Sequence, residues 1–254
     1  MAIEVGKYEI FGMPPYFFFS VLGGCISVCC YMVLLLISKI QLSKKNLFLC
    51  LFAVIGVFLG ARFFGCLTNI AISLYKKEKI GIGVIYRAGL VFYGGLFGGL
   101  FFYWIVMRLF FQKKYHRELI NSLAICIPLF HCFGRLGCLF AGCCYGIEYH
   151  GYGHIVYIRN GVVFETFPIQ LVESVVEILI FLSLIVKHSV SAKKESQNIL
   201  IIYFIEYALC RFFLEFWRGD SIRGLFGVLS FSQIISIIVF VFSLIIILGK
   251  MVKI

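Results

Sequence analysis

Charged residues are scarce in this sequence of 254 residues, since only 14% are Asp, Glu, Lys or Arg while 62% are hydrophobic. Together with a mean hydropathy of +1.02, this scarcity excludes a soluble globular domain. Acidic residues number 12 against 23 basic ones, but the basic residues are scattered and form no stripe that would bind nucleic acid. We expect membrane lipids with anionic headgroups, and no nucleic acid, as partners of this positive charge.

The sequence also lacks a polar linker, a low-complexity tract and an internal repeat, so we expect one domain over residues 1–254. Lys7 is the only basic residue before the first apolar stretch, and that stretch begins late for a signal sequence. Both features argue against a cleaved signal peptide. We therefore expect an all-α polytopic membrane protein with about seven helices, each long enough to cross a hydrocarbon core of ~30 Å. The expected spans are 15–37, 47–74, 89–112, 119–144, 169–187, 199–217 and 228–249.

An odd number of spans places the two termini on opposite sides of the membrane, and the basic residues between the spans choose the orientation. One side carries Lys39, Lys44, Lys45, Arg108, Lys113, Lys114, Arg117, Lys187, Lys193, Lys194, Lys250 and Lys253. The other side carries fewer, namely Lys7, Lys76, Lys77, Lys79, Arg87, Arg159, Arg218 and Arg223. This bias predicts an external N-terminus and a cytoplasmic C-terminus.

The sizeable stretch between the expected spans covers residues 145–167 and is rich in Gly, Tyr and β-branched residues. Asn160-Gly161 separates two apolar runs, 154–158 and 162–164, which is the signal of a β-hairpin turn. We expect this stretch to form a small external cap, in which His150 and His154 face water.

Three arginines, Arg62, Arg135 and Arg211, lie inside apolar stretches. A guanidinium at membrane depth costs at least ~2.5–3.5 kcal/mol on insertion scales, so it persists where it faces a polar cavity or a partner. These arginines therefore indicate a functional site.

Polar residues recur along the sixth expected span, at Tyr207, Arg211, Glu215 and Arg218. At ~100° per residue their side chains fall on one face of a helix. Two arginines against one carboxylate leave a positive charge that suits a phosphate, which arginine binds with two parallel hydrogen bonds. The alternative is an Arg211–Glu215 ion pair that only fixes helix packing.

The sequence has two further glycine-rich motifs, of which the first contains Arg135. The first runs from His131 to Cys138, with Arg135 between glycines, and continues over residues 142–146. Glycines flanking an intramembrane arginine indicate a broken or closely approached backbone. The second covers residues 89–99, where small residues four apart allow helices to approach closely, and Tyr93 is its only group able to do chemistry.

These motifs, in this order and spacing, resemble the prolipoprotein diacylglyceryl transferase family over most of the chain. The matching elements are Pro15-Tyr16, Gly60-Ala61-Arg62, Gly89 to Leu96, Gly134-Arg135-Leu136-Gly137, Pro168-Ile169-Gln170-Leu171-Val172-Glu173, and Tyr207 with Arg211, Glu215 and Arg218. The resemblance implies a multi-pass enzyme of the bacterial inner membrane. Such an enzyme moves diacylglycerol from phosphatidylglycerol to the lipobox cysteine of a prolipoprotein and releases glycerol phosphate.

The resemblance also assigns roles to residues. Arg135 and Arg211 become phosphate ligands that stabilise the leaving group, and no cofactor is implied. The remaining substrate-binding positions are Arg62, Gly94, Gly95, Arg218, Glu215, Tyr16 and Tyr207.

Two side chains are candidates for the base that takes the proton of the acceptor thiol. Many family members have a histidine where this chain has Tyr93, and a tyrosine with a pKa near ~10 accepts a proton poorly unless the arginines depress that pKa. His131 replaces that histidine if a broken helix brings it to the cavity. Glu173, Glu177 and Glu206 are expected to pair with polar neighbours.

Eleven cysteines are many for a membrane chain. Cys138, Cys143 and Cys144 lie beside the expected cavity, where the family usually has asparagines and a glutamate, and are candidate redox or acyl-carrying thiols. With His131 they offer four potential metal ligands, but the spacing is not that of a zinc finger, and we expect no metal ion. We expect Cys25, Cys29, Cys30, Cys50, Cys66, Cys126 and Cys210 to be small core side chains.

Three functions follow from these patterns. The favoured one is a diacylglyceryl transferase that acts on a prolipoprotein or on another thiol acceptor. The second is a divergent relative that keeps the lipid-binding scaffold and uses its cysteines for redox or metal chemistry. The third is a lipid-binding or transport protein without enzymatic activity, which an arginine-lined cavity alone would permit.

Overall fold

The computed structural model describes residues 2–5, 9–75, 77, 81, 83, 89–191, 198–219, 225–226 and 228–251. The chain divides into two compact units. The first contains Met1–Leu34, Ile120–Arg223 and Ser232–Ile254, and the second contains Leu35–Leu119 and Gly224–Phe231.

Six helices among the described residues are long and apolar enough to cross a membrane, which agrees with six of the seven expected spans. They are α1 (Pro15–Ile37), α2 (Lys44–Tyr75), α4 (Phe92–Phe110), α5 (His116–Ala141), α6 (Ile169–Ser191) and α8 (Phe231–Met251). The seventh helix, α7 (Ile199–Leu214), has only 16 residues and is followed by a 3₁₀ turn, Glu215–Trp217. The protein is therefore a mostly helical, multi-pass membrane protein.

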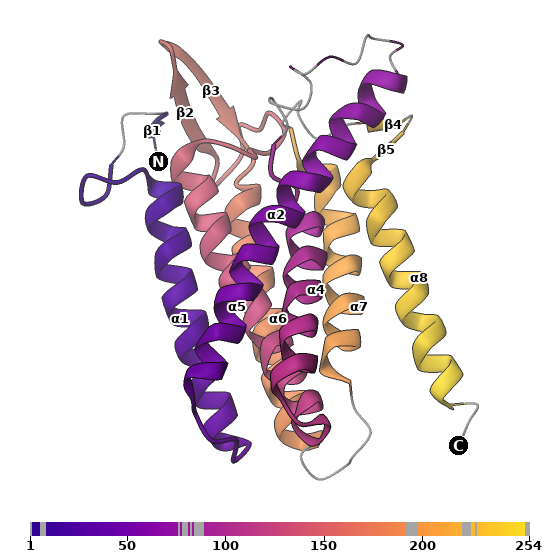
Figure 1. The fold of residues 1–254 in the computed structure, drawn as a ribbon. Coiled ribbons are helices and arrows are strands. Elements are labelled where there is room, and N and C mark those ends of the chain that lie inside the picture. Colours follow the sequence, from indigo (N-terminus) through magenta and orange to yellow (C-terminus); the bar gives the residue numbers. More distant parts are fainter. Residues whose placement is uncertain are drawn as a thin grey trace. The chain divides into compact units, whose positions relative to one another are not determined.

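Helices α5, α6 and α7 run side by side in the first unit (Figure 1). The side-chain oxygen of Asn121 on α5 accepts a hydrogen bond from the first backbone N–H of α7, at Ile199, over 3.2 Å. The hydroxyl of Ser174 on α6 donates to the backbone oxygen of Cys132 on α5 over 3.2 Å. Polar groups buried at helix contacts thus satisfy each other, as the absence of water in a bilayer requires.

The expected hairpin is present in the first unit (Figure 1). Strand β2 (Ile155–Arg159) pairs antiparallel with β3 (Val162–Thr166), and the pair Arg159–Val162 leaves Asn160 and Gly161 as the turn. Both turn residues have positive φ, 52° and 80°, as a type I′ turn requires. Strand β1 (Ala2–Glu4) adds to β2 in parallel, so the cap is a three-stranded sheet.

Helices α2 and α4 pack closely in the second unit through the predicted small residues. A Cβ atom on Gly60 would lie 2.3 Å from the carbonyl oxygen of Gly94, and one on Gly98 would lie 2.3 Å from that of Gly56. Only glycine permits this approach of two backbones. A short hairpin, β4 (Leu225–Phe226) with β5 (Leu229–Ser230), belongs to the same unit.

The structure decides between the two alternatives expected around Arg135, a broken or a closely approached backbone. Helix α5 is continuous through Gly134 and Gly137, and the backbone is closely approached at Gly137, where the Cα of Tyr16 lies 3.1 Å from a Cβ built on that glycine. The prediction for Arg218 was wrong. Arg218 lies beyond the helix, because the 3₁₀ turn ends α7 and Arg218 is extended, with ψ of 134°. It forms a β-bridge with Gly146 instead of continuing the helical stripe.

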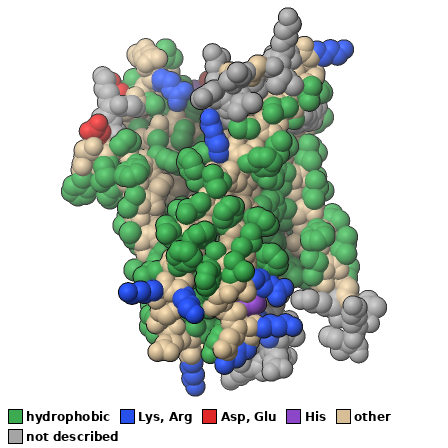
Figure 2. All heavy atoms as spheres, in the orientation of Figure 1, with side chains coloured by type: hydrophobic (Ala, Val, Ile, Leu, Met, Phe, Trp, Pro, Cys, Tyr) green, Lys and Arg blue, Asp and Glu red, His purple; other side chains and the backbone are tan. Residues whose placement is uncertain are grey.

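Many large apolar side chains are exposed on the helices, as a lipid environment requires, and they dominate the face drawn in Figure 2. Cys25 and Cys29 are also exposed on α1, so the prediction that they are core side chains was wrong, whereas Cys126 is buried as expected. Eight of the basic residues used to predict the orientation lie outside the described residues. They are Lys7, Lys76, Lys79, Arg87, Lys193, Lys194, Arg223 and Lys253.

The contact between α2 and α4 can be tested with a single methyl group. We expect Gly98→Ala to lower the Tm of the purified protein in detergent, because the methyl collides with a backbone oxygen and overpacking typically costs ~1–3 kcal/mol. Gly24→Ala on α1 is the control, since a Cβ there meets nothing within 4 Å. An unchanged Tm for Gly98→Ala would contradict the close approach.

Candidate active site

Three helices of the first unit each contribute buried polar residues spaced four apart. Helix α5 provides His131 and Arg135, α6 provides Glu173 and Glu177, and α7 provides Tyr207 and Arg211, all at most 8% exposed. Residues at i and i+4 lie on the same face of a helix, so the three faces together form one polar cluster. We call these six residues and Glu215 the arginine cluster.

The carboxylate of Glu173 joins the two arginines of this cluster. Its Oε2 lies 3.1 Å from Nε of Arg135, and its Oε1 accepts a hydrogen bond from Nη1 of Arg211. Nη2 of Arg211 also lies 2.5 Å from Oε2 of Glu215. The predicted Arg211–Glu215 pair is therefore present, but Glu173 adds a second carboxylate that links α5, α6 and α7.

A histidine–glutamate pair lies one helical turn from this bridge. Nδ1 of His131 is 2.6 Å from Oε1 of Glu177, and the His131 ring makes an edge contact with Tyr207 at 5.6 Å between centroids. The other carboxylate oxygen of Glu177, Oε2, has no hydrogen-bond partner in the described part of the chain. His131 thus has an orienting carboxylate, as a general base requires.

The cluster, taken together with the buried Arg218 that follows Glu215 by three residues, carries more positive than negative charge. Arg135, Arg211 and the buried Arg218 are permanently protonated, and Glu173 and Glu215 supply two carboxylates against them. His131 and Glu177 together are neutral when they hold one proton between them. One positive charge remains, which favours an anion beside the arginines.

The arginine cluster is closed in this structure. A cavity of about 10 Å³ is lined by His131, Glu173, Val176, Glu177, Tyr207, Cys210, Arg211 and Leu214. This volume suffices for about one water molecule, which needs ~10–15 Å³. A lipid headgroup reaches the arginines only when the surrounding side chains separate.

The three candidate thiols gather where α5 ends. Gly142 has φ of +65°, and this turn lets the backbone N–H of Cys143 donate to the backbone oxygen of Cys138 over 3.1 Å. The Sγ atoms of Cys138, Cys143 and Cys144 all lie within 4.8 Å of one another. All three are free thiols, so Cys143 and Cys144 are not bonded to each other. His131 pairs with Glu177 and does not join them.

Tyr16, at the start of α1, packs beside the same end of α5 through its contact with Gly137 and is 44% exposed. The other predicted residues belong to the second unit. Arg62 is partly buried on α2, and Tyr93 is buried on α4 and stacks on Phe97 at 6.1 Å.

Gly94 and Gly95, predicted to bind substrate, face α2. A Cβ on Gly94 would lie 2.4 Å from Phe64, and one on Gly95 would lie 3.2 Å from the backbone oxygen of Val57. The structure therefore gives both a packing role, and their contact with substrate stays a prediction.

Sequence reasoning did not count Glu173 and Glu177 among the site residues, although it expected both to pair with polar neighbours. Their spacing of four in an apolar helix is the same signal that identified Arg211 and Glu215. Glu206 also has its expected partners, since its carboxylate accepts hydrogen bonds from Lys187 and Ser183.

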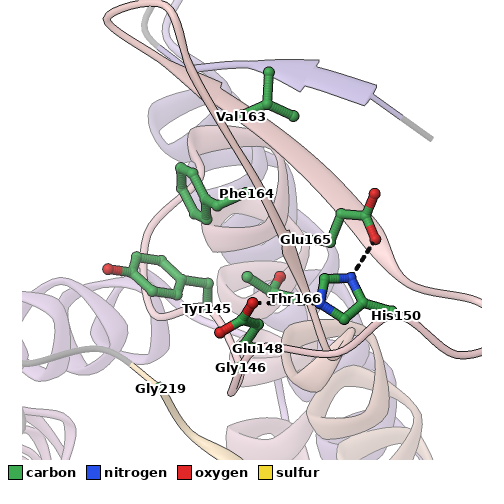
Figure 3. A pocket seen from close by; sticks show the side chains of 9 residues that line it. All are labelled: Tyr145, Gly146, Glu148, His150, Val163, Phe164, Glu165, Thr166 and Gly219. Carbon is green, nitrogen blue, oxygen red and sulfur yellow. Dashed lines mark hydrogen bonds and ion pairs between the residues drawn. The ribbon is translucent and has the colours of Figure 1, made fainter.

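The cap holds a second cavity, of about 480 Å³, outside the membrane-spanning helices (Figure 3). It is lined by Tyr145, Gly146, Glu148, His150, Val163, Phe164, Glu165, Thr166 and Gly219. His150 lies between two carboxylates, with Nδ1 2.7 Å from Glu165 and Nε2 3.3 Å from Glu148. The hydrogen bond to Glu165 and then that to Glu148 raise the pKa of His150, and the same bond to His150 lowers the pKa of Glu165.

Glu173 can be tested by removing its charge alone. We expect Glu173→Gln to lower the Tm in detergent strongly, because two buried arginines lose their shared partner and such a loss costs ~3–5 kcal/mol. Glu206→Gln is the matched control, since its pair with Lys187 is partly exposed and such pairs contribute ~0–1 kcal/mol. Equal losses of Tm in the two variants would show that Glu173 has no special structural role.

The cap pair predicts a pH dependence. A raised pKa for His150 means that its pairing stabilises the cap below about pH 6.5 and that this contribution is lost as the pH rises through the pKa in the folded protein. The pKa of Glu165 is lowered by the same pairing, so the stability that the pair contributes is also lost as the pH falls through the pKa of Glu165 in the folded protein. An NMR titration of labelled histidine should place the midpoint of His150 above ~6.5 and show a larger fall in Glu165→Gln than in Glu148→Gln. A midpoint unchanged in both variants would disprove the pairing.

Comparison with known proteins bears on this geometry. The sequence profile of the family described as "Prolipoprotein diacylglyceryl transferase" matches residues 10–249. A Clostridium perfringens (strain 13 / Type A) protein named "Phosphatidylglycerol–prolipoprotein diacylglyceryl transferase 2" is 30% identical over 250 residues, which cover 95% of this chain and 92% of that protein.

Two further relatives bear the name "Phosphatidylglycerol–prolipoprotein diacylglyceryl transferase". The protein of Clostridium novyi (strain NT) is 30% identical over 189 residues, 71% of this chain and 70% of its own length. The protein of Clostridium tetani (strain Massachusetts / E88) is 28% identical over 263 residues, with 93% and 96% covered. Since the family profile spans nearly the whole chain, this multi-pass membrane protein belongs to the prolipoprotein diacylglyceryl transferase family.

Proposed function

We propose that this protein transfers a diacylglyceryl group from phosphatidylglycerol to the lipobox cysteine thiol of a prolipoprotein and releases glycerol phosphate. The observation that carries the proposal is the buried arginine cluster, in which Arg135 and Arg211 share Glu173, together with the buried Arg218, whose positive charge is in excess. Family membership and the names of the relatives support the substrate class.

In the proposed reaction the acceptor thiolate attacks a glycerol carbon of the lipid. A C–S bond forms, the C–O bond to the phosphate breaks, and its electron pair leaves on the phosphate oxygen. Arg135 and Arg211 stabilise this developing charge, because preorganised cations in a water-poor site contribute most where charge appears. Incoming phosphate competes with Glu173 for the two guanidinium groups, so the carboxylate holds them in place until the lipid binds.

The remaining site residues receive supporting roles in the proposal. Arg218 and Glu215 complete the charge balance beside Arg211, and Tyr207 and Tyr16 are hydrogen-bonding groups toward the lipid. Arg62, Gly94 and Gly95 are assigned to the lipid headgroup by their match to the family.

His131 is the better of the two candidate bases. Its partner Glu177 orients the ring and stabilises the charge that a proton would bring, and the pair lies in the same cluster as Arg135 and Arg211. Tyr93 is buried and stacked on Phe97.

We further propose that the protein lies in the bacterial plasma membrane with its N-terminus and its cap outside. The basic residues between the spans favour this orientation. It places the cap on the side where a secreted precursor emerges.

The test uses the purified full-length protein in phosphatidylglycerol-containing micelles with a synthetic lipobox peptide. We expect release of glycerol phosphate and a peptide mass increase by one diacylglyceryl group, neither of which occurs with a peptide that has Ser in place of Cys. Bound lipid without release would favour the lipid-binding or transport alternative. Release with a small thiol but not with the peptide would identify another acceptor.

Arginine variants test the phosphate ligands in the same assay. We expect Arg135→Ala and Arg211→Ala each to lower kcat about 10²-fold or more, the usual loss when one group that stabilises developing negative charge is removed. Arg108→Ala, at the exposed end of α4, is the matched control and should keep full activity. Undiminished kcat in either cluster variant, with the Tm retained, would exclude that arginine as a phosphate ligand.

A further inference from the structure

We propose that Cys138, Cys143 and Cys144 bind one Zn²⁺ ion whose fourth position takes the acceptor thiol as a thiolate. The proposal rests on the proposed function for the identity of that thiol, but the metal site itself is argued from the three cysteines. It replaces the expectation that no metal binds there.

The backbone brings the three sulfur atoms together in one small volume. The turn at Gly142 returns the chain onto the last turn of α5, and the N–H of Cys143 donates to the backbone oxygen of Cys138. Cys144 also has positive φ, +56°, which is uncommon for a residue with a side chain and turns the next peptide sharply. As a result all three Sγ atoms lie within 4.8 Å of one another.

Further hydrogen bonds hold this loop in place. Nε2 of Gln170 on α6 donates to the backbone oxygen of Cys143 over 2.9 Å, and Nη2 of Arg159 donates to that of Gly142 over 2.8 Å. The hydroxyl of Tyr157 donates to the backbone oxygen of Leu139 over 3.0 Å. Three side chains thus hold the backbone that carries the thiols. Hydrogen bonds of this kind, outside the ligands themselves, orient the ligands of a metal site.

The number and type of ligands favour zinc. Thiolates prefer soft or borderline ions, and zinc with three protein ligands keeps a fourth, open position for water or substrate. Zn–S bonds of ~2.3 Å place two sulfur atoms about 3.8 Å apart in a tetrahedron, which is within the separation found here. Cys138 is buried, whereas Cys143 and Cys144 are partly exposed, so the cluster has an open side.

The charges around the sulfur atoms suit this ion. Three thiolates and one divalent ion carry a net charge of −1. Arg135 lies one helical turn from Cys138 on the same face of α5. A guanidinium donates hydrogen bonds and does not accept them, so this arginine adds positive charge near the site without supplying a competing ligand.

The position of the triad suits the attack on the lipid. Cys138 follows Arg135 by three residues on α5, so their Cβ atoms are ~5–6 Å apart on one face of the helix. With zinc held by the triad and a phosphate held by Arg135, the groups that bind the nucleophile and the leaving group would lie about one helical turn apart.

The chemistry balances without an oxidant or a reductant. When bound, zinc would hold the acceptor sulfur as a thiolate, because a coordinating thiol loses its proton. That proton would pass to His131, the proposed base, or to water. The sulfur electron pair forms the C–S bond, and the C–O electron pair leaves with glycerol phosphate.

The first test measures metal binding by the full-length protein in detergent, without any lipid. We expect one Zn²⁺ per chain, and we expect Co²⁺ in its place to give the absorption of thiolate-to-cobalt charge transfer. Cys138→Ala, Cys143→Ala and Cys144→Ala should each lose the metal, while Cys50→Ala on α2 keeps it. Should a variant fail to fold, alkylation mapping of the wild-type protein serves instead, since zinc should protect these three thiols and leave the exposed Cys25 and Cys29 reactive.

The second test adds the lipobox peptide to the Co²⁺-loaded protein. The cysteine peptide should strengthen the charge-transfer band by adding a fourth sulfur, whereas the serine peptide should leave it unchanged. Chelation should lower transfer to the peptide about 10²-fold, a typical contribution of proton removal, and Zn²⁺ should restore it.

The outcomes separate this inference from the proposed function. Full transfer by a metal-free protein would overturn the inference and leave the function intact. Stoichiometric metal and a spectral response to the cysteine peptide, without transfer from phosphatidylglycerol, would support the thiol site and overturn the function. Metal binding without any response to the peptide, or a preference for Cu⁺ in a closed three-sulfur site, would refute thiol activation.

Discussion

The arrangement of the first unit depends on one carboxylate, that of Glu173. Two guanidinium groups on α5 and α7 cannot be buried side by side unless an anion lies between them, and Glu173 on α6 is that anion. Because one side chain satisfies both arginines, it fixes the rotation of three helices about their axes. The same alignment places His131 one turn before Arg135 on α5 and Glu177 one turn after Glu173 on α6, where the two side chains form their own pair.

The same constraint explains how a strongly basic site remains stable before a substrate arrives. Glu173 and Glu215 neutralise most of the charge of the arginines, and the remainder is too small to require a permanent ligand. An entering phosphate replaces a carboxylate as the anionic partner of the arginines. The free-energy cost of removing the arginines from water has already been offset when the protein folded. The cavity of about 10 Å³ fits this resting arrangement.

Much of the fold could be predicted from the sequence, because the length of an apolar stretch and the residues of a tight turn are both local features of the chain. Apolar length identified the six spans that the structure describes, and Asn160-Gly161 identified the hairpin turn. The glycines of α4 pack closely against α2 as expected. The intramembrane arginines pointed to the site because burying a charge requires a partner.

The predictions that did not hold depend on contacts distant in sequence. Gly134 and Gly137 suggested a broken or a closely approached backbone, and the choice between the two depends on Tyr16 of another helix, which approaches Gly137 while α5 stays continuous. Arg218 left the helical stripe because the segment at Gly146 pairs with it. The sequence grouped the three thiols, but the close approach of their sulfur atoms depends on the positive φ of Gly142 and on Gln170 from another helix.

The length of α7 has a consequence for the surrounding bilayer. Its 16 residues rise about 24 Å, several ångströms less than a hydrocarbon core of ~30 Å, and the 3₁₀ turn that continues it begins with the charged Glu215 and does not extend the apolar stretch. A short apolar stretch is accommodated by local thinning of the membrane, at a cost of fractions of a kcal/mol per ångström. Since Arg211 lies in the last turn of α7, thinning there draws the headgroup layer toward the buried arginines. The depth that a lipid must travel is then set by hydrophobic mismatch as well as by the site itself.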